Sequence, residues 1–361
     1  MTLKDSMPFL QKDTYLSGLR NTQNTKYNLG LLLMNKTKIL ITGSSGYIGS
    51  CLNNLLNNKL LVYGIDKKKP NKWTKINKKN FYICNLLDKK KLEKTISKIM
   101  PDIVVHLAAQ STVNEKISRK EYFKNNVETT KNLVSIMCTL KIKNIIFSST
   151  AAVYDKNVKK IREHYGLKPT SKYGKSKLQA ELEIKKKSNI RHIILRFFNV
   201  SSSITKLMIG EFHMPETHLI PTSVTKAINN ETINIYGNNY PTKDGTCIRD
   251  YVHIEDICLA IINSKNYLKN EKSKSAILNI GNGKGISNNQ ILFNLKNILK
   301  KKIKIEYLKK RLGDQPFLVC NINKAKKLIK WVPKNSEINK ILKDEIKWAK
   351  FLIKNKNNRK F

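Results

Sequence analysis

The sequence predicts an α/β protein built on a Rossmann-type, doubly wound parallel sheet with a smaller C-terminal lobe. Short apolar runs alternate with stretches of helical period from Lys38 to about residue 200, which is the pattern of βαβ units and a parallel sheet. A turn with three glycines joins the first apolar run to the first helical stretch. Past residue 200 the alternation loosens, and Pro and Gly cluster within 210–245, which indicates a second lobe built partly of loops.

Each apolar run of the alternating region is bounded by polar or glycine-containing turns, as buried strands are. A helix is predicted over 172–187, entered through Pro169, Thr170 and Ser171. Apolar residues at helical spacing recur from residue 339, which indicates an amphipathic, solvated helix near the end of the chain. The predicted strands cover residues 39–41, 60–65, 103–107, 145–147 and 192–197.

Composition and charge narrow the class of protein. The 361 residues are 40% hydrophobic, which is enough to bury a sizeable core. The longest early apolar run, 29–34, is far too short to span a membrane. A net charge of +43 would suit a nucleic-acid binder, but the lysines are spread along the chain and form no single patch. We attribute the excess to mutational drift at exposed positions and expect no specific nucleic-acid partner.

The cysteines and histidines show no metal-ligand pattern. There are six of each, with no CxxC pair and no paired histidine spacing, so no metal is predicted. Scattered cysteines without a signal peptide are typical of a reducing compartment, which predicts a cytoplasmic protein.

The predicted organisation has a leader, two domains and a tail. The leader is expected to be disordered or not translated, with Met34 as an alternative start; a transit peptide is the other reading, although Arg20 is its single arginine. The parts are the leader 1–36, the Rossmann domain 37–200 with 245–265 returning to it, the second lobe 201–350 and the basic tail 351–361.

The glycine turn has the spacing of a dinucleotide-binding site. Gly43 permits the tight turn, Gly46 lets the backbone approach a pyrophosphate, and Gly49 lets the helix pack on the strand. Asp66 closes the second strand and would accept hydrogen bonds from the adenosine ribose, which favours NAD over NADP. Lys67 directly follows and could instead pair with a 2′-phosphate, so the preference for NAD depends on Asp66.

Tyr173 and Lys177 lie four residues apart and therefore on one face of the predicted helix. An ammonium beside a phenol favours the phenolate, which can take a proton from a substrate hydroxyl while nicotinamide takes a hydride. This spacing alone is common in a lysine-rich chain. Thr150 adds weight to it, because it follows a strand at the carboxyl edge of the sheet, where ligands bind in open α/β folds, and can relay the proton.

Several strings of residues resemble the extended short-chain dehydrogenase/reductase family. They are TGSSGYIG at 42–49, HLAAQ at 106–110, SSTAAVY at 148–154, YGKSK at 173–177 and LRFFNV at 195–200. Three further strings are similar to the branch of the family that inverts the 4-hydroxyl of UDP-hexoses, and the resemblance runs from about 37 to 335. They are GEFHMPETHLIP at 210–221, YGNNYPTKDGTCIRDYVH at 236–253 and NIGNG at 279–283.

The resemblance implies a role for residues at matching positions. Thr150, Tyr173 and Lys177 would be catalytic. The implied NAD-binding residues are Gly43, Gly46, Tyr47, Ile48, Gly49, Asp66, Lys67, Asn85, Leu86, Leu107, Ala108, Ala109, Gln110, Asn125 (or its neighbour Asn126), Thr150, Tyr173, Lys177 and Phe198. The implied residues for the UDP-sugar are Thr150, Tyr173, Asn199, His218, Leu219, Asn234, Ile235, Tyr236, Arg249, Arg311, Asp314 and Leu318.

The implied reaction is redox-neutral. Tyr173 and Thr150 would remove the proton of the sugar 4-hydroxyl as C4 passes a hydride to bound NAD; the 4-keto sugar would turn, and the hydride would return to its other face. The resemblance thus implies interconversion of UDP-glucose and UDP-galactose, in galactose metabolism and the supply of sugars for glycans. The second lobe would bind the UDP-sugar. Because the family is commonly dimeric, a homodimer is expected.

Three alternative functions differ in the residues that they require. Sugar 4,6-dehydratases need an acid–base pair after the strand-end threonine, where this chain has Ala151 and Ala152, so they are disfavoured. A UDP-glucuronate 4-epimerase, a decarboxylase or another UDP-sugar-modifying member stays open as the closer rival. A non-enzymatic cofactor sensor is disfavoured because Thr150, Tyr173 and Lys177 are all present. Leu318 stands where some members carry a tyrosine that blocks a 2-acetamido group, so we hypothesise that UDP-N-acetylglucosamine and UDP-N-acetylgalactosamine are also accepted.

Overall fold

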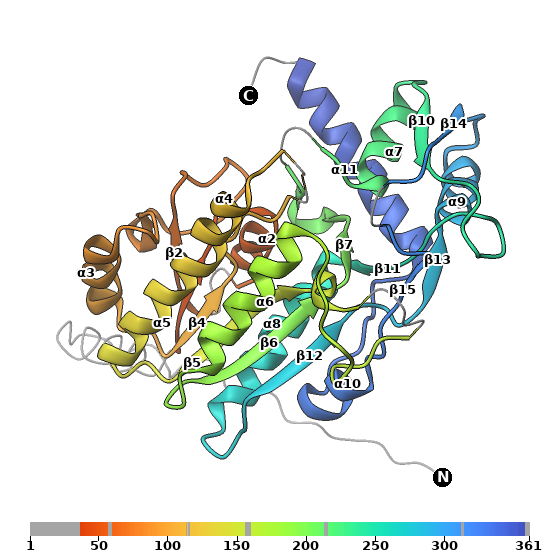
Figure 1. Cartoon of the computed structure of the whole chain (residues 1–361). Coiled ribbons are helices and arrows are strands. Elements are labelled where there is room, and N and C mark those ends of the chain that lie inside the picture. The colour runs from red at the N-terminus through yellow and green to blue at the C-terminus, as the bar shows by residue number, and fades with distance from the viewer. Residues whose placement is uncertain are drawn as a thin grey trace, which may run out of the picture. The chain divides into compact units, whose positions relative to one another are not determined.

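The computed structural model of the chain (Figure 1) describes residues 37–56, 60–112, 114, 116–155, 160–212, 216–311 and 314–357. The predicted leader, 1–36, and the last four residues of the predicted tail lie outside the described residues. Within the described residues no helix is both long and apolar enough to cross a membrane. All six cysteines are described, and all are free thiols.

A seven-stranded sheet forms the centre of the fold, and every neighbouring pair in it is parallel. The strand order β12-β6-β5-β4-β1-β2-β3 is that of a doubly wound sheet. This confirms the predicted fold class and the five predicted strands. The strands are β1 (Lys38–Thr42), β2 (Leu61–Asp66), β3 (Phe81–Ile83), β4 (Ile103–His106), β5 (Asn144–Thr150), β6 (Arg191–Phe197) and β12 (Ala276–Ile280).

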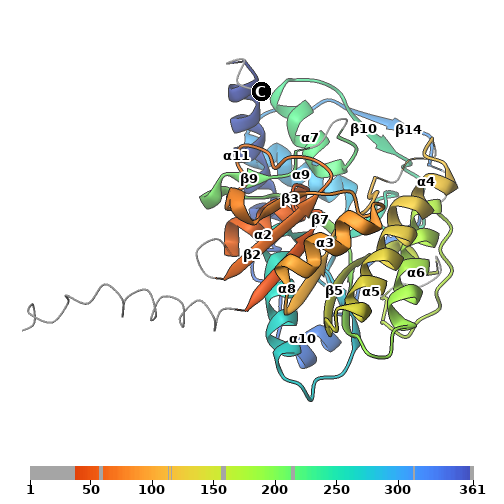
Figure 2. The same cartoon turned by 90° about the vertical axis from the view of Figure 1, so that its left-hand side faces the viewer.

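Helices cover both faces of this sheet (Figures 1 and 2). Successive side chains of a strand point to opposite faces, so Ile39 and Ile41 of β1 belong to one buried core and Leu40 to the other. The first core is completed by α2 (Tyr47–Leu56) and α8 (Ile254–Lys269). The helices that complete the second core are α3 (Lys89–Ile99), α5 (Thr129–Thr139) and α6 (Lys172–Lys185).

The chain after residue 200 is made of short strands and helices. Strand β11 pairs with β7, β13 and β15, and β10 pairs with β14 in a separate two-stranded sheet. The strands are β7 (Asn199–Ser201), β8 (Ser203–Ile204), β9 (Ile209–Gly210), β10 (Ile233–Tyr236), β11 (Ile248–His253), β13 (Gly285–Ser287), β14 (Ile305–Leu308) and β15 (Phe317–Leu318). The helices are α7 (Leu219–Ile228), α9 (Asn288–Leu299), α10 (Asn323–Ile329) and α11 (Ile338–Asn357).

Two elements after residue 200, β12 and α11, differ from what the sequence predicts for this part of the chain. Strand β12 lies within the range 201–350 and pairs with β6 as the edge strand of the main sheet. Helix α11 corresponds to the predicted C-terminal helix but is more packed than expected. Its apolar residues join those of α7 and α9 in a third core, while Lys343, Lys347 and Lys350 remain exposed.

Candidate active site

The glycine turn between β1 and α2 is held by close backbone contacts. Gly43 has a φ of +70°, and a Cβ on it would lie 2.6 Å from the Ala108 nitrogen, so a larger residue would collide with the segment after β4. A Cβ on Gly49 would lie 2.3 Å from the Gly43 oxygen. A Cβ on Gly46 would meet only that oxygen, at 3.3 Å. The turn is thus tightly packed on the protein side and open at Gly46.

Asp66 ties the end of β2 to this turn. One carboxylate oxygen accepts the Ser45 N–H at 3.0 Å and the other accepts the Lys68 N–H at 3.0 Å. Lys67 is exposed beside it. Tyr47 donates its phenolic hydrogen to the Ser202 oxygen, so its side chain is used within the fold. Only the backbone of Tyr47 is therefore available to a pyrophosphate at the start of α2.

The segment after β4 is joined to α6 through Asn126. The Gln110 N–H donates to Asn126 Oδ1 at 2.7 Å, and Asn126 Nδ2 donates to the Gln110 oxygen and to Ser176 Oγ. Asn125 instead donates to the oxygen of Glu121, four residues before it. Of the two asparagines considered, Asn126 is the one that connects Leu107–Gln110 with the Tyr173 helix.

Asn126 lies in a π-helical turn, η2 (Lys124–Glu128), which follows the short helix α4 (Arg119–Phe123). Such turns are frequent at functional sites. The two residues predicted beside adenine lie elsewhere: Asn85 is exposed and its side chain accepts the Leu87 N–H, while Leu86 is buried and its oxygen accepts from Asn132.

Thr150, Tyr173 and Lys177 meet at the carboxyl end of β5. Thr150 ends β5 beside Tyr173 and lowers the pKa of that residue. The Lys177 nitrogen lies 4.2 Å from the centre of the ring of Phe147, which is on the same strand β5. A Cβ on Gly174 would lie 2.4 Å from the Ala152 oxygen. Glycine at 174 therefore allows α6 to approach the end of β5 closely enough for Tyr173 to reach Thr150.

Burial changes the proton affinities of both residues of the pair. Burial raises the pKa of Tyr173 to about 12, although the hydrogen bond from Thr150 lowers it. Burial lowers the pKa of Lys177 to about 7, against the attraction of Glu181. The sequence led us to expect a tyrosine pKa lowered by the lysine. That expectation is wrong for the chain by itself, because the cost of burying a phenolate is the larger effect.

A buried ion pair supports the lysine from one helical turn away. Glu181 forms a bidentate ion pair with Arg196 of β6. Arg196 Nε donates to Glu181 Oε1 at 3.0 Å, and Nη2 donates to Oε2 at 2.7 Å. Ser149 of β5 also donates to Glu181. Both charged side chains are 1% exposed. This pair was not singled out from the sequence, because its partners come from three separate elements.

In the second half, four of the predicted sugar-site residues lie on or beside strand β11. Arg249 of β11 donates to the Gln315 oxygen at 2.6 Å and pairs with Asp314 at 3.4 Å. Leu318 of β15 stands opposite Arg249 in the strand pairing. Asn199 begins β7, which pairs with the same strand β11. Strand β11 thus gathers these side chains near the end of β6, where Phe198 is buried.

A second group lies on β10 and the chain after β14. The Arg311 guanidinium lies 3.7 Å from the centre of the Tyr236 ring. Asn234 and Tyr236 are half-buried on the same side of β10, whereas Ile235 is 1% exposed and packs in the third core. Only the backbone of Ile235 is therefore available to a ligand. His218 and Leu219 lie at the start of α7, with His218 half-exposed.

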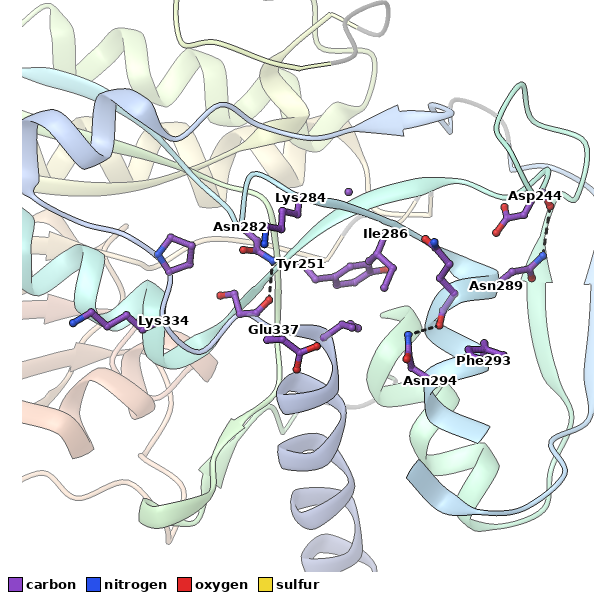
Figure 3. Close-up of a pocket in the computed structure, with 15 residues that line it drawn as sticks. Asp244, Tyr251, Asn282, Lys284, Ile286, Asn289, Phe293, Asn294, Lys334 and Glu337 are labelled. Carbon is purple, nitrogen blue, oxygen red and sulfur yellow. Dashed lines mark hydrogen bonds between the residues drawn. The ribbon is translucent and has the colours of Figure 1, made fainter. Parts of the chain in front are cut away.

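A pocket of about 800 Å³ lies between β13, α9 and the start of α11 (Figure 3). Its lining includes Asp244, Tyr251, Asn282 and Phe293. None of the predicted site residues lines it. The pocket therefore stays separate from the Thr150–Tyr173–Lys177 group.

These features of the fold and the site by themselves define a class of protein. A doubly wound sheet with a glycine turn, an acid at the end of β2 and a tyrosine–lysine pair at the carboxyl edge is typical of Rossmann-type dinucleotide-binding proteins. The chain belongs to the NAD dependent epimerase/dehydratase family, whose model matches residues 39–281.

Within that family, the chain is similar to proteins named UDP-glucose 4-epimerase. The chain is 37% identical to a UDP-glucose 4-epimerase of Mycoplasma genitalium, over 86% of this chain and 94% of that protein. It is 33% identical to one of Halalkalibacterium halodurans, over 86% and 95%. A crystal structure of a UDP-glucose 4-epimerase superposes with a TM-score of 0.82 at 34% identity, covering 87% of this chain and 98% of the other. The enzyme of Brucella ovis in complex with NAD gives 0.80 at 29% identity, covering 86% and 97%.

Proposed function

We propose that this chain interconverts UDP-glucose and UDP-galactose by inversion at C4, with NAD as its resident cofactor. The observation that carries the proposal is the contact of Thr150 with Tyr173 at the carboxyl end of β5, with Lys177 one turn further along α6. The relatives named UDP-glucose 4-epimerase support it. So does the similarity to the Bifidobacterium longum enzyme in complex with NAD⁺ and UDP, at 25% identity and a TM-score of 0.80.

The glycine turn fits a dinucleotide. The open side of Gly46 leaves room for a pyrophosphate, and the first N–H groups of α2 favour an anion there. Asp66 would receive the ribose hydroxyls, and Leu107–Gln110 and Phe198 would lie toward the nicotinamide. When bound, NAD supplies a reversible acceptor for the hydrogen and two electrons of the sugar carbon. The remaining NAD residues inferred from the family resemblance are proposed on the same basis.

Thr150 and Tyr173 would move the proton of the sugar 4-hydroxyl. Thr150 interacts with Tyr173 strongly enough to lower its pKa, so a hydroxyl there would pass a proton between the substrate oxygen and Tyr173 Oη. The cationic form of Lys177 favours the phenolate, and burial opposes it. With the pKa of Lys177 lowered to about 7, this cation is largely lost above neutral pH.

The second half would hold the nucleotide. Arg249 and Arg311 are suited to the diphosphate, because a guanidinium pairs with phosphate oxygens in a fixed fork. Asp314 positions Arg249, and Tyr236 lies against Arg311. Asn199, His218 and Leu219 would complete the sugar and phosphate contacts, and Asn234 to Tyr236 would flank the uracil.

Conversion of UDP-galactose to UDP-glucose without added reductant tests the proposal. We expect turnover by the purified chain and a loss of at least about 100-fold in Tyr173→Phe, since a positioned acid or base contributes 10²–10⁴-fold. The variant should keep its NAD content, measured after denaturation. Tyr122→Phe is the control, because that ring lies 6.2 Å from Tyr173 without being a proposed proton carrier. Full activity in Tyr173→Phe would overturn the assignment, and turnover of UDP-glucuronate alone would favour the rival substrate.

Substrate breadth is tested by the same assay on UDP-N-acetylgalactosamine. Leu318 is half-buried opposite Arg249, and a leucine leaves more room than a tyrosine. We expect measurable activity on the N-acetylated sugar and its selective loss in Leu318→Tyr. Equal losses on both sugars would contradict a gate at this position. The expected homodimer is checked by sedimentation of the same protein.

A further inference from the structure

The side chain of Lys177 is buried against an aromatic ring that the proposed mechanism does not use. Lys177 is 2% exposed, and its ammonium nitrogen lies over the Phe147 ring, 4.2 Å from the ring centre. Phe147 belongs to β5, three residues before Thr150, and is 1% exposed. A phenyl ring attracts a cation to its electron-rich face, most strongly where water is excluded. The ring therefore stabilises the charged form of the lysine.

The lysine needs this stabilisation because burial of an ammonium favours its neutral form. Burial lowers the pKa of Lys177 to about 7, and the negative charge of Glu181 acts against this effect. Glu181 is already engaged, since both of its carboxylate oxygens accept hydrogen bonds from Arg196. A carboxylate that is paired with a guanidinium offers the lysine only part of its charge. The Phe147 ring is thus a second source of compensation.

His106, at the end of β4, also acts electrostatically on Lys177, and its hydrogen bonds fit a neutral ring. Thr130 donates its hydroxyl hydrogen to a backbone oxygen of η2, so it accepts from His106 Nε2, which lies 2.9 Å away. His106 Nδ1 can then accept from the Thr42 hydroxyl at 2.7 Å, which gives the neutral Nε2–H tautomer. Burial and the charge of Lys177 lower the pKa of His106 to about 3. Although the His106 ring lies 5.5 Å from the Phe147 ring, it therefore brings no competing cation.

We propose that Phe147 is a positioning residue of the active site, whose ring holds the Lys177 side chain in its charged form beside Tyr173. The inference rests on the proposed function, in which the lysine cation favours the Tyr173 phenolate. The contact is possible because β5 and α6 pack together in the second core, to which Phe147 belongs. Phe147 acts through Lys177 and not on the substrate.

Replacement of Phe147 by fluorinated phenylalanines tests the contact while keeping a ring of nearly the same size. Fluorine withdraws electrons from the ring face, so each added fluorine weakens the attraction for the ammonium. The readout is the pKa of Lys177 in the full-length protein with NAD, followed by the NMR signal of a labelled lysine Cε that disappears in Lys177→Met. We expect this pKa to fall stepwise along the mono-, di- and trifluoro series, by about 0.4 to 1.5 in total, which is the range that a cation–π contact covers.

Phe197 is the matched control for the fluorinated series. It is buried on the neighbouring strand β6 but belongs to the first core, on the other face of the sheet. The same fluorinated residues at Phe197 should leave the pKa of Lys177 unchanged. Phe147→Leu removes the ring and should lower the pKa of Lys177 at least as far as the trifluoro residue does, with the melting temperature reporting any loss of packing.

A pKa of Lys177 that stays constant along the Phe147 series would overturn the proposal, and so would an equal fall along the Phe197 series. In a chain that epimerises, the alkaline limb of the pH–rate profile should move to lower pH together with this pKa. A pKa that falls as expected in a chain without epimerase activity would support the contact while the proposed function fails. Normal epimerase activity with a pKa that ignores fluorination would refute the contact alone.

Discussion

Two buried carboxylates, Glu181 and Glu345, differ in how their charge is compensated. Glu181, on α6, accepts two hydrogen bonds from Arg196 and one from the hydroxyl of Ser149. Glu345, on α11, has a carboxylate oxygen without a hydrogen-bond partner, and the negative charges of Glu211 and Glu216 act on it. Burial is nearly equal, at 1% and 3% exposure. The chain thus compensates the first carboxylate with a cation, whereas burial favours the protonated form of the second.

The largest loss of stability is expected when Arg196, the cation that pairs with Glu181, is replaced. Arg196→Met should destabilise the chain by about 3–5 kcal/mol, because Glu181 would stay buried without a partner. Urea unfolding measures this, with the exposed Arg119→Met as the matched control. The double variant Arg196→Met/Glu181→Met should recover much of the loss. A loss below about 1 kcal/mol in the single variant would show that the pair is not what compensates Glu181.

Glu345, unlike Glu181, should make the stability of the chain depend on pH. Its folded-state pKa of about 8 lies above the ordinary glutamate value of 4.5, so between these values the folded chain binds the extra proton. Stability is then fully present below pH 4.5 and falls as the pH rises through 8, by up to about 1.4 kcal/mol per unit.

The matched comparison for this pH dependence is Glu345→Gln, which mimics the protonated acid. The stability of the parent should fall relative to this variant between pH 5 and pH 8. Parallel stability curves for the two proteins would contradict the shifted pKa of Glu345.

The smallest loss of stability is expected from removing Ser149, the second residue that donates to Glu181. Ser149→Ala removes one hydrogen bond to a charged group and should cost about 1.5 kcal/mol while the ion pair with Arg196 remains. Ser97→Ala, at an exposed helical site, is the control. A loss as large as that of Arg196→Met would place the serine, and not the arginine, as the main partner.

The sheet and its first turn were predictable because their signals are local. The strand predicted at 39–41 extends to Lys38–Thr42, and the helix predicted at 172–187 is Lys172–Lys185. Both follow from side-chain periods of 2.0 and 3.6 residues. The return of β12 to the main sheet was not predictable in the same way, since no local period says which strand a run of residues pairs with.

For the site, the sequence determined the residue types and their spacing: three glycines in one turn, Asp66 after β2, and Tyr173 with Lys177 on one helical face. Only the tertiary structure decided what surrounds them. Desolvation, which raises the pKa of Tyr173 and lowers that of Lys177, depends on neighbours from distant elements. The same holds for the choice of Asn126 over Asn125, the arginine beside Glu181 and the meeting of Glu345 with Glu211, because each joins segments that are far apart in the chain.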